Sequence, residues 1–104
     1  MGKLVRDRIP DLIRADGRTP RVRTLNRAEL RTALYAKLAE EVDELRAAAG
    51  RDAVIEEAAD ILEVLTAIVG EYDADLDGII DAARAKRTHR GGFDMRLWLD
   101  GVEP

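Results

Sequence analysis

The fold of this chain is decided by residues 38–65, LAEEVDELRAAAGRDAVIEEAADILEVL. On both sides of Gly50, apolar residues recur at intervals of three and four, which is the spacing of one face of an amphipathic helix. Glycine commonly follows the last turn of a helix. The stretch therefore predicts two consecutive helices that separate at Gly50, and a short connection of this kind favours antiparallel packing.

Residues that favour helix ends set the extent of the helices. Asn26 is a favourable N-cap, and Glu29 three residues later completes a capping-box pattern. Gly70 and the pair Gly91–Gly92 lie where the next two apolar periodicities stop. A short helix before them begins at Pro10, whose fixed backbone angle suits a first helical turn. The sequence therefore predicts helices over residues 10–15, 27–49, 52–69 and 75–89.

Beyond the glycine pair the periodicity changes. Residues 93–99 alternate apolar and polar side chains, which is the period of a half-buried strand. A lone strand needs a partner, and residues 21–25 are the candidate in this chain because they contain the β-branched Val22 and Thr24. A second copy of the chain could also supply one. We therefore expect a mainly α fold, an antiparallel helical bundle completed by oligomerisation, with a short C-terminal strand pairing with residues 21–25.

Length and composition narrow the class of protein. At 104 residues the chain is long enough for one hydrophobic core, so we expect a single domain over residues 1–104. It contains no cysteine, which excludes disulfides and thiolate metal ligands and is compatible with a reducing cytoplasm. No apolar run approaches the ~20 residues of a membrane span. We therefore expect a cytoplasmic protein that does not bind membranes.

The charged residues are segregated along the chain. Residues 1–27 contain eight Lys/Arg and three Asp, whereas residues 28–81 contain four Lys/Arg and fifteen acids. An acidic centre repels the phosphate backbone of DNA and RNA, which argues against a nucleic acid polymer as partner. Carboxylates recruit divalent cations and basic side chains hold phosphates, so the pattern favours a small substrate that carries both metal and phosphate.

Four of the acids lie at positions that should face the core. On a helical projection Glu41 falls inside the apolar arc of its helix, and Glu44 borders that arc. Glu57 and Asp60 repeat this arrangement on the next helix. A carboxylate on a core face is costly unless a cation is nearby, and oxygen ligands of this kind suit Mg²⁺ or Mn²⁺. The alternative is that these acids are ordinary solvated residues on charged helices.

Basic residues near both ends are candidates for binding phosphate. Along the predicted helix over residues 75–89 the inner stripe changes from apolar to cationic at Lys86 and continues to Arg90. These cations could instead complement the dipole at the end of a helix. Lys3 and Arg6 are secondary candidates, because basic N-terminal residues are common.

The acidic motifs resemble a known family. Residues 40–44, EEVDE, and residues 57–60, EAAD, resemble the EExxE…ExxD signature of the MazG-like pyrophosphohydrolases. The opening KLVRDRIP at residues 3–10 and the closing AKRTHRGGF at residues 85–93 look like the small stand-alone subgroup described as house-cleaning enzymes. The resemblance therefore extends over nearly the whole chain.

The resemblance implies a fold, an activity and a set of site residues. The fold is an all-α bundle completed by oligomerisation, here as a homodimer or homotetramer. The activity is Mg²⁺-dependent hydrolysis of a nucleoside triphosphate, canonical or noncanonical, between its α and β phosphates, giving a monophosphate and pyrophosphate. The acids implied as metal ligands are Glu41, Glu44, Glu57 and Asp60.

We assign expected roles on this basis and keep two alternatives. Glu40 is expected to act as a base or to orient the attacking water, and Glu41 to act through the metal. Lys86, Arg90, Lys3 and Arg6 are expected to bind the substrate phosphates. One alternative is phosphoribosyl-ATP pyrophosphohydrolase, which resembles this fold and cleaves the same kind of bond. The other is a non-catalytic helical module whose acids bind a structural cation or a basic partner protein.

Overall fold

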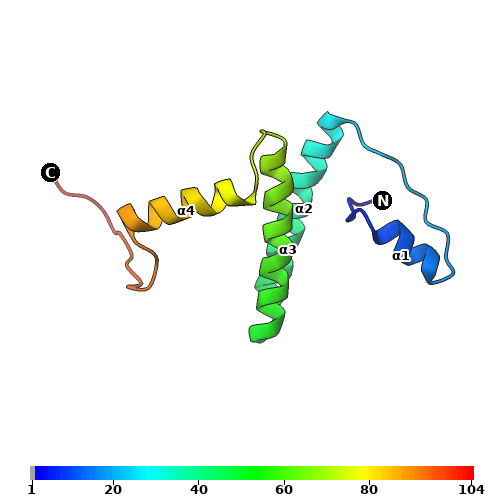
Figure 1. Cartoon of the computed structure of the whole chain (residues 1–104). Coiled ribbons are helices and arrows are strands. Elements are labelled where there is room, and N and C mark those ends of the chain that lie inside the picture. The colour runs from blue at the N-terminus through cyan, green and yellow to red at the C-terminus, as the bar shows by residue number, and fades with distance from the viewer. Residues whose placement is uncertain (1) are drawn as a thin grey trace.

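The computed structural model of the chain describes residues 2–104 and contains four α-helices in that range. α2 and α3 lie side by side as an antiparallel pair, while α1 and α4 project to opposite sides of it (Figure 1). α4 contacts α3 and no other helix of the described chain. The helices are α1 (Ile9–Ala15), α2 (Arg27–Ala47), α3 (Arg51–Gly70) and α4 (Leu76–Arg90).

Local capping explains where two of these helices begin. The Asn26 side chain accepts a hydrogen bond from the Glu29 backbone N–H at 2.8 Å, and the Glu29 carboxylate accepts one from the Asn26 N–H at 3.0 Å. This confirms the predicted capping box at the start of α2. Asp75 caps α4 by accepting from the Gly78 N–H at 3.0 Å. The helices therefore begin where short side chains satisfy the free backbone donors.

The role predicted for Gly50 is wrong. α2 ends at Ala47, with Ala48 as its C-cap, and Gly50 is the residue from which α3 begins. Its φ of 91° lies in the left-handed region that glycine enters without steric cost. Gly50 therefore turns the chain into α3 rather than closing α2. Gly70, predicted to follow α3, is its last helical residue.

The predicted C-terminal strand is also wrong. No strand occurs within residues 2–104, and residues 93–99 follow α4 as turns and irregular chain. Residues 21–25, the predicted partner, are irregular as well. The N-terminal region and the C-terminal region lie on opposite sides of the α2–α3 pair, so these two segments cannot meet within one chain (Figure 1). An alternating pattern forms a strand only when a pairing edge is within reach.

The buried core of the described chain is narrow and lies in the seam between α2 and α3. Leu34 and Val64 are its buried apolar residues, at 4% and 8% exposure. Three large apolar residues of the two helices are exposed: Tyr35, Val42 and Val54. The two helices of a single chain therefore cover only part of each other's apolar faces.

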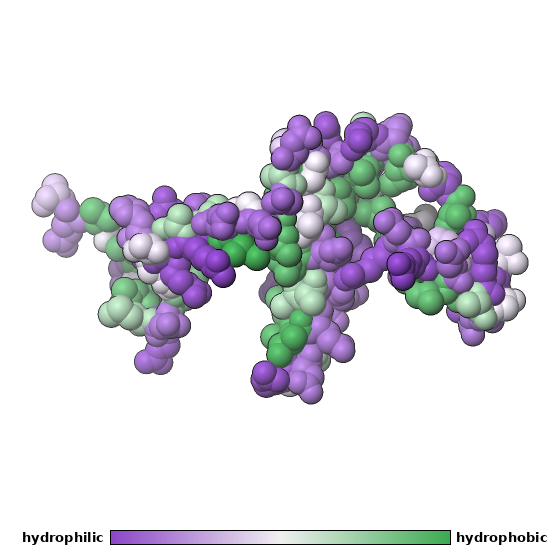
Figure 2. Space-filling view, in the orientation of Figure 1, coloured by the Kyte–Doolittle hydropathy of each residue, from purple (hydrophilic) through white to green (hydrophobic). Residues whose placement is uncertain are grey.

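The overall dimensions agree with this partial burial. The exposed surface is 9469 Å², whereas a compact chain of 11.5 kDa exposes about 5,800 Å². The radius of gyration is 18.0 Å, against about 13 Å for a compact domain of this length. Apolar surface remains visible along the helices and on the C-terminal segment (Figure 2). No helix of the described chain combines the length and the apolar character needed to cross a membrane.

Candidate metal centre

Five carboxylates converge in the seam between α2 and α3. Glu40, Glu41 and Glu44 of α2 each place an oxygen within 4.8 Å of the others. Glu41 also forms such a group with two acids of α3, Glu57 and Asp60. Acids three residues apart share a helix face, and the antiparallel pairing sets the two faces against each other. The structure therefore brings together the four acids predicted to bind metal, together with Glu40.

Glu41 is the centre of the cluster. It is 5% exposed, which confirms its predicted position on the core face of α2. One of its oxygens lies 3.3 Å from the Lys37 ammonium. The other oxygen, Oε2, and Oε2 of Glu57 are buried and have no hydrogen-bond partner. Buried carboxylate oxygens without a donor are costly, and a bound cation removes that cost.

Crowding among these acids raises the pKa of Glu44. The pKa of Glu44 is raised above its ordinary value of 4.5, first because its side chain shares a hydrogen bond with Glu41. Repulsion from the Glu41 charge and partial desolvation raise it further, and Glu57 adds a smaller contribution of both kinds. The raised pKa of Glu44 therefore follows from its closeness to the other acids of the cluster.

Two basic side chains reach the cluster. Arg6, from the N-terminal segment, contacts the Asp60 carboxylate at 2.7 Å. Both side chains are about half exposed, so the pair contributes about 1 kcal/mol or less to stability. Lys37 lies 3.7 Å from Glu40 in addition to its contact with Glu41. Arg6 was predicted to bind phosphate, but the structure places it on an acid of the cluster.

Lys37 was missed by the sequence analysis. Its spacing of four residues from Glu41 is the one at which a cation and an acid meet on a helix surface. Lys37 and Glu41 are the one pair of opposite charge at this spacing in α2, so the signal was usable. At 20% exposure its side chain is held in the cluster rather than in solvent.

The other predicted phosphate ligands lie outside the cluster. Lys86 and Arg90 are exposed on the second half of α4, which projects away from the α2–α3 pair (Figure 1). Lys3 is exposed in the N-terminal segment. None of these three forms an ion pair with any residue from 2 to 104. Their binding to phosphate stays a prediction.

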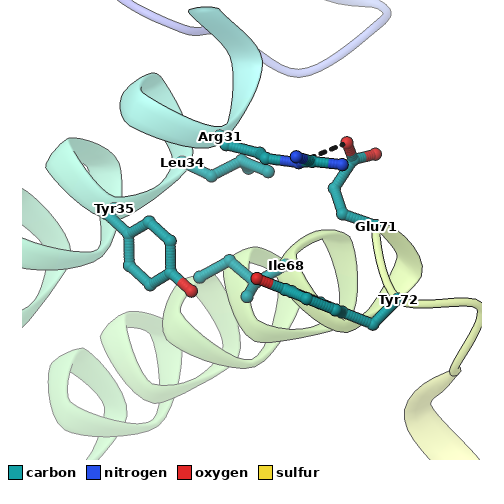
Figure 3. Close-up of a pocket in the computed structure, with 6 residues that line it drawn as sticks. All are labelled: Arg31, Leu34, Tyr35, Ile68, Glu71 and Tyr72. Carbon is teal, nitrogen blue, oxygen red and sulfur yellow. Dashed lines mark ion pairs between the residues drawn. The ribbon is translucent and has the colours of Figure 1, made fainter. Parts of the chain in front are cut away.

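A second set of charges lies where α2 begins and α3 ends. Glu71, with its side chain 9% exposed, lies 2.8 Å from Arg27. It also lies 3.6 Å from Arg31 (Figure 3). The adjoining cavity, between Tyr35 and Tyr72, measures about 10 Å³. That volume holds at most one water molecule. These contacts fasten the two helices together and leave no room for a substrate.

The chemistry of the acidic cluster fits a small, hard divalent cation. All of its acceptors are carboxylate oxygens, the ligands that Mg²⁺ and Mn²⁺ prefer. The two buried oxygens without partners are available to such an ion. No histidine lies in the cluster and the chain contains no cysteine, so the donor set does not suit zinc. The arrangement is able to bind a divalent cation that in turn binds a phosphate group.

Comparisons with known proteins agree with this arrangement. Residues 11–87 match the family model of phosphoribosyl-ATP pyrophosphohydrolase, a range that includes every acid of the cluster. The chain is also 66% identical over 56 residues to an uncharacterized protein of Mycolicibacterium smegmatis. That alignment spans 54% of this chain and 57% of the relative, so the chain covers little more than half of the relative's length. No solved structure matches. The chain belongs to the phosphoribosyl-ATP pyrophosphohydrolase family, which confirms its resemblance to the MazG-like all-α pyrophosphohydrolases.

Proposed function

We propose that this protein hydrolyses a nucleoside triphosphate, canonical or noncanonical, between its α and β phosphates and releases a monophosphate and pyrophosphate. The observation that carries the proposal is the pair of buried carboxylate oxygens, on Glu41 and Glu57, that have no hydrogen-bond partner inside a cluster of five acids. A third such oxygen, Oε1 of Glu71, lies 3.6 Å from Arg31, so what distinguishes the oxygens of Glu41 and Glu57 is their place among other acids. A bound cation would remove the cost of burying them there. The family match supports the class of reaction.

Glu41, Glu44, Glu57 and Asp60 are the residues that would hold Mg²⁺ or Mn²⁺. When bound, such an ion neutralises phosphate charge and lowers the pKa of a coordinated water. The structure supports this assignment through the all-carboxylate donor set and through the two buried oxygens without a partner.

The remaining side chains of the cluster orient the reactants. Glu40 is the most suitable group to orient the attacking water or to accept its proton, because 42% of its side chain is exposed while Glu41 is buried. Lys37 lies between these two acids and holds them in place. Arg6, with its exposed guanidinium, is able to turn from Asp60 to a substrate phosphate.

Lys3, Lys86 and Arg90 complete the proposal as phosphate ligands. Because α4 projects away from the cluster of its own chain, Lys86 and Arg90 are more suitably supplied to the cluster of a second copy. A homodimer or homotetramer would also cover the exposed apolar residues of α2 and α3. Oligomerisation is therefore part of the proposed function.

A second candidate substrate is phosphoribosyl-ATP, which the family match favours. The bond broken is again the anhydride between the α and β phosphates, so the acidic cluster would have the same task. The two substrates differ in the phosphoribosyl group that phosphoribosyl-ATP carries on its base.

The test incubates the purified protein and Mg²⁺ with a panel of canonical and modified nucleoside triphosphates and with phosphoribosyl-ATP, resolving all phosphate products. We expect a monophosphate and pyrophosphate in equal amounts. Glu41→Gln and Asp60→Asn should lower the rate at least ~100-fold while the helix content is retained. Glu63→Gln, at an exposed acid of α3 that is not part of the cluster, is the matched control and should change the rate less than about twofold.

Turnover of phosphoribosyl-ATP alone would select the second candidate. No turnover of any substrate, together with metal-dependent folding, would contradict the enzyme proposal and leave the non-catalytic module. Orthophosphate as the product would contradict cleavage between the α and β phosphates.

A further inference from the structure

The described chain contains a large groove without an occupant. It lies between the N-terminal segment, residues 21–25 and the first half of α2, and we call it the N-terminal groove. Its volume is about 1270 Å³, which exceeds the ~300–1,000 Å³ of ordinary small-molecule clefts. Much of its wall is apolar, formed by Leu4, Val5, Val22, Leu25 and Leu30. A groove of this size and character suits a segment of polypeptide.

One wall of this groove offers free backbone groups. Residues 19–25 form no backbone–backbone hydrogen bond with the rest of the described chain. They are neither helix nor strand, although Val22 and Thr24 have high strand propensity. An irregular segment with unpaired N–H and C=O groups is an edge to which an extended peptide is able to add.

The C-terminal segment, residues 93–102, has the complementary properties. Its apolar side chains are almost fully exposed, with Phe93 at 97%, Leu97 at 81% and Trp98 at 86%. After the turn closed by the hydrogen bond from the Arg96 N–H to the Phe93 C=O, its backbone has no partner within residues 2–104. It retains the alternation of a half-buried strand. A run of exposed apolar residues like this one marks an interaction surface.

Charge also matches between the two regions. Two basic residues and one acid of the N-terminal groove form no ion pair among the described residues, which leaves a net positive charge: Lys3, Arg21 and Asp7. In the C-terminal segment and the two residues after it, acids outnumber bases: Asp94, Asp100 and Glu103 against Arg96. None of these four is paired in the described chain either. Unpaired charges of opposite sign therefore occur on the groove and on the segment.

The two regions cannot meet within one chain. They lie on opposite sides of the α2–α3 pair, and α4 carries the C-terminal segment further away (Figure 1). The molecule is elongated, with principal extents of 63 × 34 × 25 Å, which agrees with this separation. The apolar surface that the C-terminal segment exposes is visible in Figure 2. Any occupant of the groove that comes from this sequence must come from a second copy.

We propose that the C-terminal segment of one copy adds as a strand to residues 19–25 of a second copy and fills its N-terminal groove. The exchange is reciprocal, so each copy supplies one segment and one groove in a closed dimer. The strand that fills the groove also packs against the N-terminal segment, from which Arg6 contacts Asp60. The exchange rests on the oligomerisation that is part of the proposed function, and it names the two segments through which the copies meet.

Engineered disulfides test this exchange directly, because the chain has no cysteine of its own. A tagged Val22→Cys chain is mixed with an untagged chain that carries a cysteine at Leu97, Trp98 or Leu99, and the mixture is oxidised mildly. We expect mixed disulfide dimers whose yield alternates along the three positions, since successive side chains of a strand point to opposite faces. Asp77→Cys, exposed at the start of α4, is the matched control and should give at least ~5-fold less.

A second measurement uses the uncross-linked full chain. The double substitution Leu97→Asp, Leu99→Asp should shift the sedimenting mass toward the 11.5 kDa single chain and raise the dissociation constant at least ~10-fold, with helix content unchanged. Absence of mixed disulfides, equal yields at all four positions, or association unchanged by the double substitution would overturn the proposal. A disulfide formed only within one chain that carries both cysteines would overturn it as well.

Discussion

The acidic seam between α2 and α3 and the C-terminal segment both carry a clear sequence periodicity, but only the seam adopts the predicted structure. A helix satisfies its backbone hydrogen bonds within itself. Sequences with a 3.6-residue period, such as those of α2 and α3, therefore form helices whatever lies next to them. A strand satisfies its backbone only through a neighbouring strand, and residues 93–99 have none within residues 2–104. The comparison shows that an apolar period of 3.6 residues predicts a helix by itself. An alternating pattern predicts a strand only when a second segment is available to pair with it.

The largest expected effect concerns packing in the seam. Leu34→Ala should lower the free energy of unfolding by about 3 kcal/mol, because Leu34 is 4% exposed and the substitution leaves a cavity between α2 and α3. Denaturant unfolding at fixed protein concentration measures the change. Leu12→Ala, at a leucine 62% exposed on α1, is the matched control and should cost less than about 0.5 kcal/mol. Equal losses at both sites would show that the seam is not the core.

A divalent cation should stabilise the seam and leave the C-terminal segment unaffected. At a Mg²⁺ or Mn²⁺ concentration ~100 times the dissociation constant, stability should rise by about 2.7 kcal/mol. Glu57→Gln should abolish most of this increase, since it replaces one of the buried oxygens without a partner. Thermal unfolding with and without EDTA checks the effect. An unchanged increase in the variant would remove Glu57 from the set of ligands.

The capping box at the start of α2 should contribute about 1 kcal/mol, so Asn26→Ala should lower stability by that amount. The pKa of Glu29 lies below its ordinary value of 4.5, first because its carboxylate accepts the Asn26 backbone N–H and then because of Arg23. A lowered pKa in the folded state means that this stabilisation is complete above pH 4.5 and is lost as the pH falls through the folded value.

Acid titration of the unfolding transition measures the loss. Glu29→Gln should remove the part of the pH dependence that lies below pH 4.5. If the stability of Glu29→Gln depends on pH below 4.5 as strongly as that of the parent, other carboxylates account for the pH dependence.

The smallest effect is expected at Arg6. Its exposed contact with Asp60 contributes about 1 kcal/mol or less, so Arg6→Gln should barely change stability. Because the variant frees Asp60, the affinity for Mg²⁺ should rise, by about fivefold at most. Isothermal titration of the metal measures this, with Arg14→Gln, whose partner is Asp11 on α1, as the control. Weaker metal binding in Arg6→Gln than in the control would contradict competition between Arg6 and the cation.

The candidate site was largely predictable, because it depends on two helices that the sequence marks clearly. Glu41 lies inside the apolar arc of α2 on a helical projection, and it is buried in the structure. The meeting of α2 and α3 followed from the short connection at Gly50, even though the exact role of that glycine was predicted wrongly. The contact between Arg6 and Asp60 was not predictable, since 54 residues separate them and no local pattern links them.

By itself, the sequence determined the four helices, the capping box and the alignment of the acids on two helix faces, because each of these depends on neighbours within one or two helical turns. Only the tertiary structure decided that Lys37 and Arg6 are the cations of the cluster, that α4 carries Lys86 and Arg90 away from it, and that residues 93–99 form no strand with residues 21–25. These outcomes depend on the directions in which the connections send the helices. Those directions are set by packing between residues far apart in the sequence, and a local sequence pattern does not predict such packing.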